Sequence, residues 1–329
     1  EIWGQIEPPP EFGFRQQERG LILDCSRRKA LQLPAALALS AGLVGIQAAR
    51  AEKAAPGELP SGEFHVDVDD FRMFCQVQGE GPLLIHQTGI WTYSSVATLA
   101  PMNEALAKHF TVLTMDCRGQ GGSTLGNGPT TYSRAAADTA RLMDKLGIDD
   151  AHFFGVSDGG CIQLELLLDF EERVRSSTLC GTPYSHDAYT PQLQATFKKW
   201  HAAMLADSDD FYGLTDEPHT PEVLAAMRDN YAAVSPHPEK FIEVLKGQRR
   251  CWATEPDVSL RRLTAIKRPV LVVNSASDEY IPKAAFDALE NAIPASQSIY
   301  FDDMKHNPLT HVSQITQAMV KFTGGVDDR

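Results

Sequence analysis

Positive charge is scarce in this 329-residue chain, which has 30 lysines and arginines against 43 aspartates and glutamates, a net charge of −13. Nucleic-acid binding needs a basic surface, so we expect no nucleic-acid partner. The six cysteines include no pair at metal-ligand spacing, and no metal site is predicted. We expect most of them to be small buried apolar side chains, and their spacing leaves any disulfide pairing open.

Residues 1–51 are predicted to lie outside the fold. The basic patch Ser26-Arg27-Arg28-Lys29 contains a twin arginine, a mildly apolar run follows over Leu31–Ala49, and Ala49-Arg50-Ala51 has a small-x-small cleavage pattern. This resembles a Tat export signal cleaved before Glu52, and it implies an exported, periplasmic or secreted protein. The run is too polar for a stable membrane span, and an uncleaved N-terminal anchor is the alternative. The residues before the basic patch are assigned no role.

After residue 52, short apolar runs alternate with segments of helical spacing, which is typical of a doubly wound, mostly parallel α/β sheet. The alternation stops over residues 183–267, which are helical and polar and are predicted to form a cap. The core is therefore divided into residues 52–182 and 268–329. Strands are predicted over 64–68, 71–77, 83–85, 111–115, 151–154, 174–180, 269–274 and 298–301, and core helices over 102–109, 132–146, 161–170, 282–292 and 311–322.

The segment Gly155-Val156-Ser157-Asp158-Gly159 lies between a predicted strand and a predicted helix. A strand–turn–helix with the pattern G-x-S-x-G is tight, so the positions two before and two after the serine must be nearly without side chains, and both are glycine. Such a turn exposes the serine hydroxyl beside the free N–H groups at the start of the next helix. Ser157 is therefore the predicted nucleophile.

A serine needs a base, and the base needs an acid that orients it. On this fold the acid follows a late strand and the histidine follows the last strand, which selects Asp278 and His306. His311 is the competing histidine, but it falls where the final helix begins. Asp302 and Asp303 are too close in sequence to His306 to reach under its ring, and we expect them to be solvated loop residues.

The oxyanion that forms during acyl transfer needs two N–H donors. The amide of Asp158, next to the nucleophile, is one predicted donor. The amide of Thr88, in His86-Gln87-Thr88-Gly89 after the strand over 83–85, is the other.

Taken together, these motifs resemble α/β-hydrolase-fold enzymes with a helical cap, in the carboxylesterase and prolyl-aminopeptidase-like group. The resemblance covers residues 64–323. It rests on His86-Gln87-Thr88-Gly89, Asp116-Cys117-Arg118-Gly119-Gln120-Gly121, the serine turn, Asp278 and His306.

Two positions depart from the family pattern. Gln87 replaces a usual glycine, and Lys305 replaces a glycine before the histidine, where its charge is expected to lower the pKa of His306. Asp116-Cys117-Arg118-Gly119 is expected to be a structural, charged turn rather than a catalytic one.

The carboxylate of Asp158 has two interpretations. Serine followed by Asp-Gly-Gly also resembles amino-acid ester hydrolases, in which this aspartate binds the amino group of the substrate. The simpler interpretation, which we prefer, is that the carboxylate stabilises the start of its helix. Asp158 as the nucleophile is disfavoured, because Val156 would then occupy a position that needs a small residue.

Trp91 and Tyr93 are predicted to line an acyl pocket, although packing is the common role of such aromatic residues. Four aromatic residues of the predicted cap either face the substrate or form the core of the cap: Trp200, Phe211, Tyr212 and Trp252.

The sequence thus predicts a serine hydrolase that cleaves small-molecule esters or related acyl compounds through an acyl-enzyme, without a metal or organic cofactor. A C–C bond hydrolase or a lactonase would use the same triad, and a cofactor-free haloperoxidase-like or perhydrolase activity is also compatible with it. A non-catalytic binding protein on the same scaffold ranks lower, because all three triad candidates are present. Natural substrate and oligomeric state stay open.

Overall fold

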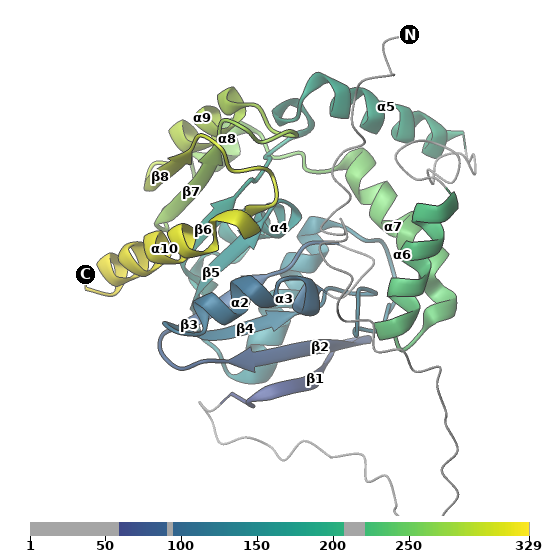
Figure 1. Ribbon diagram of the computed structural model, residues 1–329, viewed down its shortest axis with the longest axis horizontal. Coiled ribbons are helices and arrows are strands. Elements are labelled where there is room, and N and C mark those ends of the chain that lie inside the picture. The colour runs from purple at the N-terminus through teal and green to yellow at the C-terminus, as the bar shows by residue number, and fades with distance from the viewer. Residues whose placement is uncertain (1–58, 91–94, 207–220, 329) are drawn as a thin grey trace, which may run out of the picture. The chain divides into compact units, whose positions relative to one another are not determined.

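Within the described residues, eight strands of this computed structural model form one sheet in the order β1-β2-β4-β3-β5-β6-β7-β8 (Figure 1). The structure describes residues 59–90, 95–206 and 221–328, so the predicted signal segment lies outside it and stays a prediction. β1 and β2 form a hairpin, β2 is antiparallel to β4, and the remaining neighbours are parallel. The strands are β1 (Gly62–Val68), β2 (Phe71–Gln78), β3 (Leu83–Gln87), β4 (Thr111–Met115), β5 (Ala151–Val156), β6 (Val174–Cys180), β7 (Val270–Ser275) and β8 (Ser296–Phe301).

Helices cover both faces of the sheet, as a doubly wound fold requires. Apolar residues of α3 (Tyr132–Leu146), α4 (Asp158–Asp169) and α9 (Lys283–Ala292) belong to one core cluster with β2, β5 and β6. Those of α2 (Ala100–Leu106) and α10 (Val312–Asp327) pack on the other face. A short helix, α1 (Ser95–Thr98), precedes α2. The predicted α/β fold class is confirmed.

Local sequence explains several helix ends. Thr131 caps α3 by accepting the N–H of Arg134, and Gly147 ends the same helix with φ of 68°, a left-handed conformation that suits glycine. Helix α4 begins at Asp158, three residues before its predicted start. The later start was predicted because Gly159 and Gly160, which lie in the first turn of the helix, are poor helix formers. Helix α10 continues past its predicted end at residue 322.

The described part of the chain between β6 and β7 is largely helical, as its sequence predicted. It contains α5 (Pro191–Leu205), α6 (Pro221–Val234), α7 (Phe241–Thr254) and α8 (Leu260–Leu263). In Figure 1, α6 and α7 lie side by side, and Tyr231 of α6 packs on Phe241 of α7 in a small core of their own. Within the part of the chain that is described, no helix is both long and apolar enough to span a membrane.

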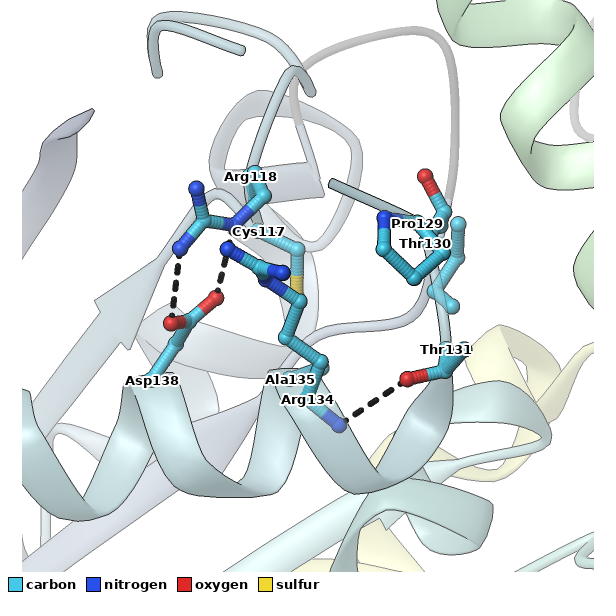
Figure 2. Close-up of a pocket in the computed structure, with 9 residues that line it drawn as sticks. Cys117, Arg118, Pro129, Thr130, Thr131, Arg134, Ala135 and Asp138 are labelled. Carbon is cyan, nitrogen blue, oxygen red and sulfur yellow. Dashed lines mark hydrogen bonds and ion pairs between the residues drawn. The ribbon is translucent and has the colours of Figure 1, made fainter. Parts of the chain in front are cut away.

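The charged turn after β4 connects several elements, in agreement with its predicted structural role. Arg118 contacts the carboxylate of Asp138 in α3 through two nitrogens, at 3.1 and 2.9 Å, and reaches Asp70 at 2.7 Å with its third. Figure 2 shows this forked contact beside a small hollow at the start of α3. Neither the predicted nucleophile nor its partners line that hollow. Asp116 accepts the N–H groups of Val96 and Gly122, which fixes the turn itself.

Replacing Arg118 by methionine should destabilise the protein by about 3–5 kcal/mol, because Asp138 is 2% exposed and would lose its forked partner. Arg141→Met is the matched control. Its guanidinium is half exposed and lies 4.0 Å from the same carboxylate, so its loss should cost about 1 kcal/mol or less. Urea unfolding of both variants at pH 7 measures the difference. Equal losses would contradict a dominant role for Arg118.

Candidate active site

Ser157 joins β5 to α4 in a conformation that few side chains tolerate. Its φ is 54° and its ψ is −115°, and it is one of two described non-glycine residues with positive φ. A Cβ on Gly155 would lie 2.6 Å from the Gln163 side chain, and a Cβ on Gly159 would overlap the carbonyl oxygen of Gln87. The turn therefore requires glycine at both flanking positions, as the sequence pattern predicted.

The predicted oxyanion loop lies against the first turn of α4. A Cβ on Gly159 would be 3.5 Å from the carbonyl carbon of Thr88, which shows how closely the two backbones approach. The amide of Asp158 is the first of α4, and the first amides of a helix have no acceptor within the helix. The loop that carries Thr88 therefore packs against the helix start that carries the Asp158 amide, and the role of these two amides as oxyanion donors stays a prediction.

Gln87, which replaces the usual glycine, helps to fix this loop. Its side-chain oxygen accepts a hydrogen bond of 2.8 Å from Thr139, and its Nε2 donates to the carbonyl of Thr88 at 3.2 Å. The Thr88 hydroxyl donates to the carbonyl of Met115 at 2.6 Å. The departure from the family pattern therefore adds contacts to the loop rather than removing them.

His306 and Asp278 meet although 28 residues separate them. Nδ1 of His306 is 2.9 Å from Oδ2 of Asp278, and both side chains are nearly buried. The other carboxylate oxygen accepts the N–H groups of Tyr280 and Ile281, each at 2.9 Å, so the acid cannot rotate freely. The structure thus places the predicted base and the predicted acid in direct contact.

The end of β6 lies between Ser157 and the His306–Asp278 pair and contacts both. The N–H of Ser157 donates to the carbonyl of Cys180 at 2.9 Å. A Cβ on the next residue, Gly181, would lie 3.4 Å from the ring of His306 and 3.5 Å from Asp278. Among the described residues the Ser157 hydroxyl has no hydrogen-bond partner, so its bond to His306 stays a prediction. Such bonds are often long in free enzymes and shorten when substrate binds.

Negative charge around the ring controls its proton affinity. Burial on its own would lower the pKa of His306, but the charge and hydrogen bond of Asp278, with the charges of Glu279 and Asp158, raise it above its ordinary value. The expectation that Lys305 lowers this pKa is wrong. Lys305 is exposed, where solvent screens its charge, whereas the carboxylates act on a buried ring.

The carboxylate of Asp158 is buried and held by protein donors. Its Oδ1 accepts the hydroxyl of Tyr132 at 2.6 Å, and its Oδ2 accepts the indole N–H of Trp252 at 3.0 Å. Burial raises the pKa of Asp158, and both of these hydrogen bonds oppose that rise. This carboxylate therefore connects the serine turn with α3 and α7, a role that needs no substrate.

The competing residues have other partners. His311 is the N-cap of α10, and its Nε2 is 3.1 Å from the exposed carboxylate of Asp303. Asp302 is exposed, as expected for a loop residue. His86 is fully buried, and burial lowers its pKa to about 4, so it remains neutral in the core near Asn103.

Several predicted pocket residues lie outside the described residues, namely Trp91, Tyr93, Phe211 and Tyr212. Trp200 is 6% exposed and packs on Phe197 and Trp252, so it belongs to the core of the helical segment. Trp252 also belongs to that segment, but its indole reaches Asp158. No sequence pattern points to Tyr132 or Glu279, because their roles depend on contacts between segments that are distant in the chain.

The comparisons with known proteins agree with the fold. A family model described as the alpha/beta hydrolase fold matches residues 81–310, and the chain belongs to that family. A 2-hydroxy-6-oxononadienedioate/2-hydroxy-6-oxononatrienedioate hydrolase from Paraburkholderia phymatum is 26% identical over 227 residues, which cover 65% of this chain and 77% of that protein.

A dihydrolipoyllysine-residue acetyltransferase component of an acetoin cleaving system, from Cupriavidus necator, is 32% identical over 272 residues, 79% of this chain and 68% of that protein. Among solved structures, a thermophilic esterase from Thermogutta terrifontis with bound malate has a TM-score of 0.62 at 20% identity. That likeness covers 81% of this chain and 99% of the esterase, and it shows the fold alone.

Asp158→Asn should leave the preference between cationic and neutral acyl esters unchanged within about twofold, because protein donors already occupy both carboxylate oxygens. It should lower stability by about 1–3 kcal/mol, since an amide presents an N–H to one of those donors. The ratio of kcat/KM values for the two ester classes checks this, with Tyr132→Phe as the control that removes one donor. A tenfold fall of the ratio in Asp158→Asn alone would establish substrate binding by this carboxylate.

Proposed function

We propose that this protein is a serine hydrolase that cleaves carboxylic esters or related acyl compounds through an acyl-enzyme. Ser157 is the nucleophile, His306 the base and Asp278 the orienting acid. The observation that carries the proposal is the 2.9 Å contact of His306 with Asp278, beside the end of β6 to which the Ser157 amide is bonded. Membership of the α/β-hydrolase family supports the same reaction class.

In the proposed reaction, Oγ of Ser157 attacks the substrate carbonyl carbon while Nε2 of His306 takes the hydroxyl proton. Asp278 stabilises the resulting imidazolium, and the amides of Thr88 and Asp158 bind the oxyanion. The imidazolium then gives its proton to the leaving alkoxide, and the acyl-enzyme remains. Water repeats the sequence: His306 accepts its proton, the acid departs and Ser157 regains its hydroxyl.

We further propose that the helical segment between β6 and β7 is the cap that selects the substrate. The hydrogen bond from Trp252 to Asp158 supports this, because it brings α7 to the residue beside the nucleophile. Gln248 of α7 also donates to the carbonyl of Ile90 at 2.6 Å, just after the oxyanion loop. A substrate pocket beneath this segment would then be lined both by α7 and by the loops beside Ser157.

A C–C bond hydrolase is the second candidate, and the Paraburkholderia phymatum relative favours it. Both reactions use the same triad and differ in the group that leaves the carbonyl carbon. Substrate identity therefore depends on the cap rather than on the triad.

Ser157→Ala should abolish labelling by a fluorophosphonate and reduce kcat by at least about 10⁴-fold, because the nucleophile is lost while the scaffold remains. Ser133→Ala, an exposed serine of α3, is the matched control and should retain both. Mass spectrometry of the labelled peptide and hydrolysis rates are the measurements.

Substrate class follows from a panel of esters graded in acyl length and charge, extended with a lactone and a 2-hydroxy-6-oxo-dienoate. Turnover of esters that depends on Ser157 supports the first candidate, and turnover of the dienoate alone supports the second. Labelling that persists in Ser157→Ala would overturn the assignment of the nucleophile.

A further inference from the structure

Two loops at the edge of the sheet are joined by several side-chain hydrogen bonds. The acid loop, residues 276–282 after β7, carries Asp278, and the histidine loop, residues 302–307 after β8, carries His306. Ser277 donates to the carbonyl of Asp302 at 2.7 Å, and Ser275, the last residue of β7, donates to the carbonyl of Met304. These bonds hold the backbone that leads to His306.

Glu279 holds the main chain of His306 itself. Its Oε2 accepts the backbone N–H of His306 at 3.0 Å, while the neighbouring Asp278 contacts the ring of the same residue. His306 is 7% exposed, so without Glu279 its N–H would lose its partner in a nearly dry environment, which is costly. Two consecutive carboxylates thus hold one histidine, one by its ring and the other by its main chain.

The position of an imidazole depends on the position of the Cα to which it is attached. Asp278 restrains the rotation of the imidazole, but the position of the ring relative to Ser157 also depends on the backbone of the histidine loop. Misplacement by about 1 Å can cost a hundredfold in rate. The hydrogen bond that Glu279 accepts from the His306 N–H fixes this position of the backbone.

We propose that Glu279 is a positioning residue of the active site, whose carboxylate fixes the main chain of His306 and thereby the imidazole relative to Asp278 and Ser157. This inference rests on the proposed function. Glu279 contacts the main chain of His306 rather than its ring, and it acts through that residue.

The charge of Glu279 has a separate, measurable effect. It is one of the negative charges that raise the pKa of His306. The tyrosine next to it packs edge-on against the imidazole, with ring centroids 4.8 Å apart. The titratable groups that face the ring or adjoin it are Asp278, Glu279 and Tyr280 of the acid loop, Asp158 of α4, Cys180 at the end of β6 and the exposed Lys305.

The charge of Glu279 should also affect the pH at which activity falls on the acidic side. The general base must be neutral, so activity rises with pH through the pKa of His306. Removal of the Glu279 charge destabilises the imidazolium and lowers that pKa. The acidic limb of kcat/KM should then move to lower pH, by about half a unit or more.

Glu279→Gln and Glu279→Ala separate charge from position. Glutamine keeps an acceptor for the N–H of His306, so this variant should shift the limb and keep its plateau within about tenfold of wild type. Alanine removes both the charge and the acceptor. This variant should therefore show the same shift of the limb and a further fall in plateau kcat of about 10- to 100-fold, with KM unchanged. Ser277→Ala is the matched control. It removes an uncharged bond between the same two loops and should leave the limb where it is.

The measurements are pH profiles of kcat/KM and kcat for an ester substrate and the rate of fluorophosphonate labelling, with circular dichroism to verify folding. An unmoved limb in Glu279→Gln, or a plateau of Glu279→Ala within twofold of Glu279→Gln, overturns the proposal. Should Glu279→Ala not fold, Glu279→Met takes its place, because methionine keeps the length of the side chain but has neither the charge nor a strong acceptor for the N–H of His306. Failure of the wild type to label at Ser157 would overturn the proposed function instead, so the two failures are distinguishable.

Discussion

The backbone of Ser157 is the constraint on which the rest of the candidate site depends. A side chain held at φ of 54° costs about 1–3 kcal/mol, and buried strands and helices on both sides of the turn hold it there. Its N–H is bonded to β6 and its carbonyl accepts the N–H of Cys161 in α4. The same turn directs the start of α4 toward the oxyanion loop. The proposed nucleophile, the predicted oxyanion amides and the base–acid pair are therefore all positioned relative to one strained residue.

The site separates two kinds of charge stabilisation. Carboxylates act on the imidazole, which becomes positive during the proposed reaction, and the backbone amides of Thr88 and Asp158 are the predicted donors for the negative charge. Asp158 contributes to both, because its amide is a predicted oxyanion donor while its carboxylate is held by Tyr132 and Trp252. The two hydrogen bonds therefore fix the carboxylate against Tyr132 and Trp252.

Much of this arrangement could be predicted from the sequence, because strand and helix periods and the glycines at 155 and 159 are local signals. β4, β6 and α3 have the predicted bounds, and Asp278 and His306 follow from their places after late strands. The partners of Asp158 could not be predicted, since Trp252 is 94 residues away in sequence. The error about Lys305 has a related cause: the adjacent residue in sequence is exposed, and residues from other segments determine the field at the ring.

The indole of Trp252 couples the helical segment between β6 and β7 to the proton affinity of His306. Trp252 belongs to the segment between β6 and β7, its hydrogen bond favours the charged form of Asp158, and that charge in turn raises the pKa of His306. Replacement of this tryptophan by a residue without a donor would therefore favour neutral Asp158 and lower the pKa of an imidazole that is distant from the tryptophan in sequence, because the two are coupled through one carboxylate.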